Sequence, residues 1–196
     1  MYSIKNNIDN TIIIKKSKFI TKLYKINNLN EINTILENLK KEYRDATHIC
    51  YAYILNGIQK CSDDGEPSKT AGMPILNVLK KQGLNYILAV VIRYFGGIKL
   101  GAGGLTRAYS NSIIEALNIA EIVELTDGYN ITIEFDYNNI KEIDMLLKDI
   151  EIYNKIFDEL IVYSLYITDE KFQEINIKLN SICTKIIINE KILLTK

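Results

Sequence analysis

The chain has 196 residues, of which 47% are apolar and 24% charged, and its 24 Lys and Arg residues balance 24 Asp and Glu residues. This composition excludes collagen-like, coiled-coil and disordered chains. Three cysteines without paired spacing, no apolar run long enough to span a bilayer, and an amino-terminal MYSIKNNIDN without a hydrophobic signal segment predict a cytoplasmic protein with reduced thiols.

Apolar periodicity predicts alternating strands and helices in the first part of the chain. The expected strands are residues 11–15, 18–26, 48–55 and 86–92, and the expected helices are 29–43, 73–81 and 105–120. Residues 86–92 are apolar on both faces, which is typical of a central strand covered on both sides. The polar turn formers SDDGEPSKTAG, residues 62–72, predict a loop that we call the acidic loop.

The second part repeats the order strand, helix, strand. Strands are expected at residues 129–137, 152–157, 160–168 and 184–188, with helices over 140–150 and 169–182. Asp169 is a plausible N-cap for the last helix. The pattern predicts a ferredoxin-like (βαββαβ) domain, an antiparallel sheet covered by two helices on one face. With Asp127–Gly128 as the hinge, we expect an α+β protein with domains 1–126 and 127–196.

Charge and glycine are unevenly distributed. Residues 1–126 hold 16 Lys and Arg against 11 Asp and Glu, a net charge of +5, whereas residues 127–196 hold 8 against 13, a net charge of −5. Nine of the ten glycines lie between Gly57 and Gly104, together with both prolines, and these residues mark special backbone geometry. The second part has no His or Arg. We therefore expect chemistry in the first domain and binding or assembly in the second.

The sequence RYFGGIKLGAGGLTRAY, residues 93–109, is the strongest local feature, and we call it the glycine segment. A buried strand leads into glycines and then a helix, so backbone N–H groups and the helix amino terminus can attract an anion. The spacing matches neither the Walker nor the dinucleotide-binding pattern, and a tight corner that needs glycine for steric reasons is the alternative. The candidate anion-binding residues are Arg93, Gly96, Gly97, Lys99, Gly101, Gly103, Gly104 and Arg107.

The acidic loop places Asp63, Asp64 and Glu66 within four residues. They could hold Mg²⁺ or share a proton, form an ordinary solvated turn, or pair with basic groups of the glycine segment and orient them. His48, the only histidine, is a candidate general base but is more often structural when alone. If the protein is an enzyme, the catalytic candidates are His48, Asp63, Asp64 and Glu66. No metal site is assigned, because His48, Cys50 and Cys61 fit no standard zinc spacing.

Four motifs resemble the IMPACT family, specifically its bacterial YigZ-like branch. They are SKFI (17–20), ATHICYAY (46–53), SDDGEPSKTAGMPIL (62–76) and VVIRYFGGIKLGAGGLTRAY (90–109). The resemblance implies a first domain similar to the second domain of a small-subunit ribosomal protein, and a second domain similar to the last domain of the ribosomal translocase. Lys69 stands where the family pattern usually has glycine. If that glycine supplied a positive φ, Lys69 would strain the loop.

Eukaryotic members of the family resemble regulators of translation initiation. The resemblance therefore implies a regulator linked to translation that binds RNA or the ribosome through the basic, glycine-rich cleft. The alternative is a small-molecule enzyme acting on a phosphorylated or nucleotide-like substrate in the same cleft, with Mg²⁺ as a possible cofactor. Self-association is a further expectation for the acidic second domain, and no membrane partner is expected. The ligand, any turnover and the oligomeric state are left open.

Overall fold

The chain divides into two compact units, Met1–Val123 and Glu124–Lys196. The computed structural model describes residues 1–195 as a mixed α+β protein, with two sheets and five α-helices in that part of the chain. None of the helices in residues 1–195 is long and apolar enough to cross a membrane.

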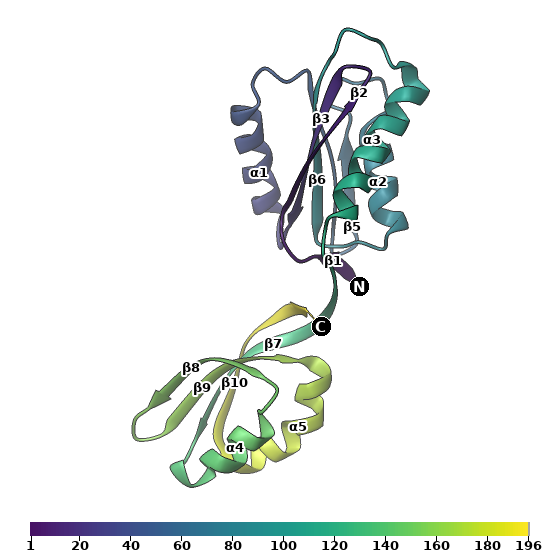
Figure 1. The fold of residues 1–196 in the computed structure, drawn as a ribbon. Helices are drawn as coiled ribbons and strands as arrows, with labels where there is room; N and C mark the ends of the chain where they lie inside the picture. Colours follow the sequence, from purple (N-terminus) through teal and green to yellow (C-terminus); the bar gives the residue numbers. More distant parts are fainter. Residues whose placement is uncertain (196) are drawn as a thin grey trace. The chain divides into compact units, whose positions relative to one another are not determined.

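The N-terminal unit is built around an antiparallel sheet with the strand order β2-β3-β6-β4-β5 (Figure 1). The strands of the N-terminal unit are β1 (Tyr2–Ile4), which is not part of this sheet, β2 (Ile8–Ile14), β3 (Ser17–Lys25), β4 (His48–Leu55), β5 (Ile58–Ser62) and β6 (Ile87–Tyr94). Its helices are α1 (Leu29–Glu42), α2 (Gly72–Lys81) and α3 (Gly101–Asn118). Helix α1 covers one face of the sheet, and α2 and α3 cover the other (Figure 1).

The central strand β6 explains the apolar run in the sequence. Ala89 and Val91 pack in the cluster shared with α2 and α3, whereas Val90 and Ile92 pack in the cluster shared with α1. All four side chains are fully buried. Since a fully buried Val or Ile side chain contributes about 1.5–3 kcal/mol, this strand anchors the layers that hold the site.

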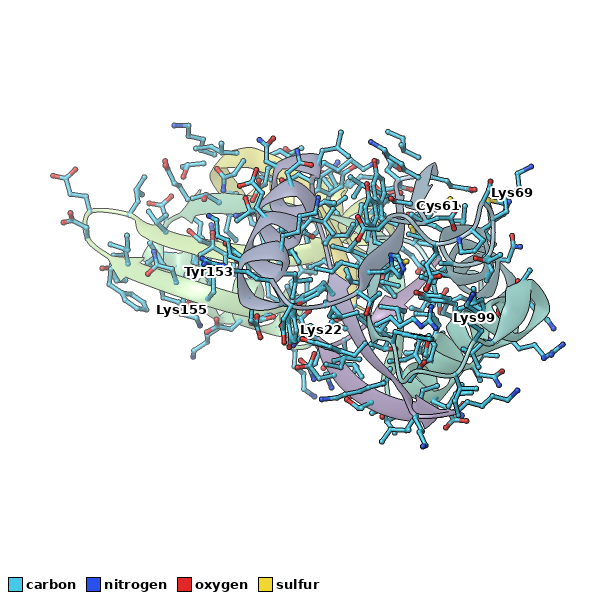
Figure 2. All side chains as sticks on the ribbon, turned by 90° about the horizontal axis from the view of Figure 1, so that it is seen from above. Lys22, Cys61, Lys69, Lys99, Tyr153 and Lys155 are labelled. Carbon is cyan, nitrogen blue, oxygen red and sulfur yellow. The ribbon has the colours of Figure 1, made fainter. Side chains whose placement is uncertain are left out.

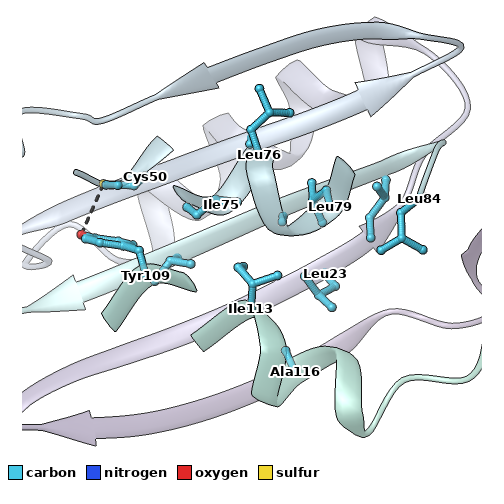
Figure 3. Packing of buried hydrophobic residues seen from close by; sticks show 14 of the residues in the cluster. Leu23, Cys50, Ile75, Leu76, Leu79, Leu84, Tyr109, Ile113 and Ala116 are labelled. Carbon is cyan, nitrogen blue, oxygen red and sulfur yellow. Dashed lines mark hydrogen bonds between the residues drawn. The ribbon is translucent and has the colours of Figure 1, made fainter. Parts of the chain in front are cut away.

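The core between the sheet and the pair α2 and α3 is mainly apolar, and it includes the contact between Cys50 and Tyr109 (Figure 3). Leu79 of α2 and Ile113 of α3 are fully buried in it. The Cys50 thiol lies 3.4 Å from the Tyr109 hydroxyl, and the Tyr109 ring meets Phe19 edge to face, with 5.4 Å between centroids. The polar contact lies at the end of the sheet that carries both predicted loops.

The C-terminal unit has the expected element order of strand, helix, strand, strand, helix, strand. Its elements are β7 (Ile122–Phe135), the 3-10 helix η1 (Tyr137–Asn139), α4 (Ile140–Leu146), β8 (Glu151–Phe157), β9 (Ile161–Thr168), α5 (Asp169–Ile182) and β10 (Cys183–Thr195). The strands lie in the order β10-β7-β9-β8, all antiparallel. Both helices pack on one face through a core that includes Ile133, Phe135, Ile175 and Leu179.

Two expectations for this part of the chain are wrong in detail. Gly128 is not in a hinge loop but inside β7, paired with Thr168 and Ile192. A Cβ on Gly128 would lie 2.5 Å from Leu194 Cδ1, so this glycine serves close packing. The N-cap of α5 is Thr168 rather than Asp169, since its side chain accepts from the Lys171 N–H at 3.2 Å.

The structure also differs from the sequence prediction in the N-terminal unit. Strand β5 (Ile58–Ser62) was not expected, because its edge position leaves most of its side chains exposed and weakens the apolar pattern. Helix α3 begins at Gly101, four residues before the expected start at residue 105. Three glycines therefore lie within the bounds of α3, the first of them with a positive φ, and the loop between β6 and α3 is shorter than expected.

Candidate functional site

A cleft of about 380 Å³ lies where β4 begins, β6 ends and α3 begins. The acidic loop and the glycine segment both contribute to its walls. Its lining includes His48, Glu66, Arg93, Phe95, Lys99 and Gly101. The two loops therefore border one shared concave surface, which is the arrangement that the anion-site hypothesis requires.

Glu66 and Arg93 form a buried ion pair at this cleft. Arg93 Nη1 donates to Glu66 Oε1 at 2.5 Å, and the two side chains are 6% and 2% exposed. The Tyr109 hydroxyl donates to the same oxygen at 2.8 Å. The guanidinium carbon lies over the rings of Phe19 and Phe95, 5.5 and 5.7 Å from their centroids. Because Glu66 neutralises its charge, Arg93 is not a free ligand for an anion, contrary to its place among the candidates.

Asp63 holds the acidic loop together. Its carboxylate accepts from the backbone N–H groups of Lys69 at 2.8 Å, Ala71 at 3.0 Å and Gly72 at 2.8 Å. Burial raises the pKa of this carboxyl, but the three donors outweigh burial and hold the pKa below its ordinary value. Asp63 is thus an ionised acceptor for the start of α2 rather than a group that exchanges protons with a substrate.

Asp64 ties the same loop to β4. Its Oδ2 accepts from the Ile49 N–H at 2.6 Å, and its carbonyl oxygen lies 2.8 Å from His48 Nδ1. Since a carbonyl can only accept, Nδ1 carries the proton, and the other nitrogen of the neutral ring is an acceptor. His48 is only partly exposed and its Nε2 lies 3.9 Å from Glu66 Oε2. His48 is therefore the candidate catalytic residue that stays at the cleft with a free nitrogen.

The three carboxylates do not converge on one point. Each has its own partners, and residues 1–195 contain no group of three His, Cys, Asp or Glu side chains placed to hold a metal ion. The three carboxylates therefore do not form a shared Mg²⁺ site in the described residues. Cys50 is also unsuited to a metal site, because its thiol is fully buried and donates to the Asp63 carbonyl at 3.0 Å. Burial raises the pKa of this thiol to about 12.

The glycines of the glycine segment serve different purposes. A Cβ on Gly96 would overlap the Lys16 carbonyl and the Ser17 nitrogen, so Gly96 allows the β2–β3 turn to approach. Gly97 and Gly101 have φ of +84° and +70°, which favour glycine. Gly103 and Gly104 lie in the first turn of α3. The steric interpretation is correct for Gly96, and it does not exclude an anion at the helix start.

Lys99 and Arg107 keep their charges available. Both are exposed, and neither has an ion pair or side-chain hydrogen bond within residues 1–195. Lys99 lines the cleft, and Figure 2 marks it together with Lys69 of the acidic loop. Arg107 is outside the cleft lining, and its Nη1 lies 3.7 Å from the position of a Cβ on Gly103 in the first turn of α3. Helix α3 has no side-chain cap at Leu100.

Three positioning residues were missed in the sequence. Tyr109 was not among the candidate site residues, but it is fully buried and donates to Glu66. Ser17 Oγ accepts from the Gly96 N–H at 3.2 Å, and Thr47 Oγ1 accepts from the Phe95 N–H at 2.9 Å. The available signals were the positions of Ser17 and Thr47 beside strand starts and of Tyr109 within the last quoted motif.

Comparisons with known proteins agree with these motifs. The family model of the Impact N-terminal domain matches residues 15–117, which include every residue of the cleft. "IMPACT family member YvyE" of Bacillus subtilis (strain 168) is 39% identical over 180 residues, or 87% of this chain and 81% of that protein. "IMPACT family member YigZ" of Escherichia coli (strain K12) is 34% identical over 173 residues, covering 85% of each chain.

One solved structure, described as that of "an hypothetical protein", matches with a TM-score of 0.66 and 31% identity. It covers 92% of this chain and 91% of the other, so the likeness extends over both units. The motif resemblance, the family model and the bacterial relatives agree. The chain belongs to the IMPACT family.

Proposed function

We propose that this protein is a translation-linked regulator that binds RNA, free or within the ribosome, at the cleft of its N-terminal unit. One observation carries the proposal: Lys99 and Arg107 flank an uncapped start of α3 and lack ionic partners in the described chain. Backbone N–H groups at a helix start and unpaired cations are the features that bind phosphate. Membership of the IMPACT family supports the link to translation.

The distribution of charge supports phosphate contacts at the rim of the cleft rather than at its floor. At the floor, Glu66 neutralises Arg93. Lys99 lines the cleft without an ionic partner in the described residues, and Lys16, whose backbone packs against Gly96 of the same glycine segment, has an exposed side chain. A strand of RNA can therefore place its phosphates along the rim while a nucleoside faces the cleft.

The fold assignments belong to the same proposal. We infer that the C-terminal unit is ferredoxin-like and similar to the last domain of the ribosomal translocase. The strand order β10-β7-β9-β8, with α4 and α5 on one face, supports this. We also infer that the N-terminal unit, close to the expected domain 1–126, is similar to the second domain of a small-subunit ribosomal protein. A cytoplasmic location would follow from work on the ribosome.

A salt series tests the proposal. Binding of the full chain to short RNAs and to ribosomes is measured at increasing salt, for the native protein and for Lys99→Ala and Arg107→Ala. Each variant should weaken binding and reduce the slope of log K against log salt by about 0.7–0.9, because one phosphate contact is lost. Lys80→Ala is the matched control, since Lys80 is exposed in the last turn of α2, away from the cleft. Absence of saturable binding at low salt would rule the proposal out.

The cleft also favours a second candidate function, an enzyme acting on a phosphorylated or nucleotide-like small molecule. A volume of about 380 Å³ suits such a ligand, and His48 Nε2 is placed at the wall as a possible base. Thermal unfolding with nucleotides, with and without Mg²⁺, tests this candidate, because a ligand of the native state raises the unfolding temperature. A nucleotide-dependent shift that Lys99→Ala abolishes, without RNA binding, would favour the enzyme over the regulator.

A further inference from the structure

Two hydrogen-bond acceptors face each other at the floor of the cleft without a donor between them. His48 Nδ1 donates to the Asp64 carbonyl at 2.8 Å, so Nε2 of the neutral ring has a free lone pair. Glu66 Oε1 receives both Arg93 and Tyr109, whereas Oε2 receives no hydrogen bond from residues 1–195. Nε2 and Oε2 lie 3.9 Å apart, beyond hydrogen-bond distance.

A ligand that binds at this pair of acceptors has to offer a hydrogen-bond donor. Glu66 is 2% exposed in its side chain and cannot turn its carboxylate away, because Arg93 and Tyr109 hold the other oxygen. Because Glu66 lines the cleft, a hydroxyl or amine of a ligand can donate to the free Oε2 of this carboxylate. A second carboxylate or a bare phosphate would be repelled at the floor.

The rim of the same cleft favours a negatively charged group on the ligand. Lys99 and the start of α3 favour an anion, and Phe95, which is 46% exposed, offers a ring face to a base. A ligand that suits both regions therefore carries a negative charge and, close to it, a hydroxyl that can donate. A ribonucleotide within a strand has this combination, because its 2′-hydroxyl is free beside the phosphodiester, whereas the sugar of a deoxynucleotide has no hydroxyl at that position.

We propose that His48 Nε2 and Glu66 Oε2 accept a hydrogen bond from the 2′-hydroxyl of one ribonucleotide, so that the cleft distinguishes RNA from DNA. This inference rests on the RNA binding proposed above, and it adds the chemical group of the RNA that the cleft recognises, the 2′-hydroxyl. In the bound strand the phosphate lies at Lys99 and the start of α3, the base lies against Phe95, and the sugar faces the floor. The buried ion pair then acts through Glu66: Arg93 and Tyr109 fix Oε1 and leave Oε2 directed at the sugar.

Three oligonucleotides of the same length test the inference by fluorescence anisotropy at one low salt concentration: oligouridine, oligodeoxyuridine and 2′-O-methyl oligouridine. The methylated strand keeps the 2′-oxygen and the ribose pucker but cannot donate. We expect the native protein to bind oligouridine about tenfold more tightly than either of the others, as a hydrogen bond to a charged acceptor implies. Equal affinity for all three strands would overturn the proposal that the cleft recognises the 2′-hydroxyl, and it would leave the proposed phosphate contacts intact. Absence of binding to any of the three strands would overturn the proposed function itself.

Variants assign the preference to the floor of the cleft. Glu66→Gln and His48→Phe should each reduce the preference for oligouridine severalfold, with little change in affinity for oligodeoxyuridine. Glu42→Gln, an exposed carboxylate on α1, should keep the full preference. If Glu66→Gln does not fold, His48→Phe and the methylated strand decide the question. A preference that survives in a folded His48→Phe variant and in folded Glu66→Gln would overturn the assignment, as would tight binding of the methylated strand.

Discussion

The acidic loop and the glycine segment meet at the same cleft, but they use their charges in opposite ways. All three carboxylates of the acidic loop are bonded within the protein, Asp63 and Asp64 to backbone N–H groups and Glu66 to Arg93. In the glycine segment, Lys99 and Arg107 have no ionic partner in the described residues. The acids beside this cleft therefore bond groups of the protein itself, whereas the charges of Lys99 and Arg107 are left uncompensated in the described residues.

The backbone explains the difference. The acidic loop has N–H groups near the start of α2 that lack partners in a helix or strand, and a carboxylate satisfies three of them at once. In the glycine segment, neutral hydroxyls accept from the backbone N–H groups of the turn. The Thr47 hydroxyl accepts from the Phe95 N–H, and the Ser17 hydroxyl accepts from the Gly96 N–H. Neutral acceptors leave the nearby cations uncompensated, so these remain available for a ligand.

The largest expected effect comes from breaking the link between the two loops. Arg93→Met leaves Glu66 as a buried charge without its cation, and the free energy of unfolding should fall by about 3–5 kcal/mol. Urea denaturation of the full chain measures the loss. Arg107→Met removes an exposed arginine from the same segment and should change stability by less than about 0.5 kcal/mol. The double variant Arg93→Met/Glu66→Gln should recover part of the loss, and similar values for the two single arginine variants would contradict the comparison.

A smaller effect is expected within the acidic loop. Asp63→Asn replaces an ionised acceptor of three N–H groups with a neutral amide, and should lower the free energy of unfolding by about 1–3 kcal/mol. The pKa of Asp63 is lower in the folded protein than the ordinary value of 3.8. Its stabilising contribution is therefore present above that ordinary value and is lost as the pH falls through the lower, folded one.

Urea unfolding at neutral and acidic pH checks both parts of this prediction. The native protein should lose more stability on acidification than Asp63→Asn, because the variant has already lost the titrating group. Glu37→Gln, an exposed carboxylate on α1, should retain the native pH dependence. Parallel pH profiles for the native protein and Asp63→Asn would show that Asp63 is not the ionised acceptor.

Most of the fold follows from periodicity in the sequence. The double coverage of β6 could be read from its apolar run, and the stripe on α1 from Ile32 and Leu39, because burial on one or two faces leaves a clear pattern. The start of α3 could not be predicted from the sequence, since glycine has a low intrinsic propensity for helix and the glycines here are included in α3 by the surrounding structure. The role of Gly128 was equally hidden, because it depends on Leu194 at the far end of the unit's sequence.

The site was predicted in position but not in its internal bonding. The sequence indicated that two distant loops border one cleft, and it offered three interpretations of the acids. It could not choose among them, because the choice depends on side-chain directions set by long-range contacts. Glu66 turns inward to Arg93 and Tyr109, 27 and 43 residues away in the sequence. Pairing of the acids with a basic group was among the interpretations, and Glu66 alone fulfils it.

The smallest effect concerns Lys69, which occupies the usual glycine position of the family pattern. Its φ is +63°, so the condition under which Lys69 would strain the loop is met. A side chain there costs about 1–2 kcal/mol relative to glycine, and glycine loses about 0.5–1 kcal/mol of this advantage through its greater freedom in the unfolded chain. Lys69 is exposed, and its N–H donates to Asp63, a bond that glycine can also make.

Lys69→Gly should therefore raise the free energy of unfolding by up to about 1 kcal/mol, measured by urea or thermal denaturation. Ser68→Gly is the matched control, because Ser68 lies next to Lys69, is also exposed and does not have a positive φ. It should lower stability by about 0.5–1 kcal/mol through unfolded-state entropy alone. Opposite signs for these neighbouring substitutions would show that the acidic loop holds a fixed backbone, whereas equal signs would mean that it relaxes around the lysine and that its carboxylates constrain it less than the hydrogen bonds indicate.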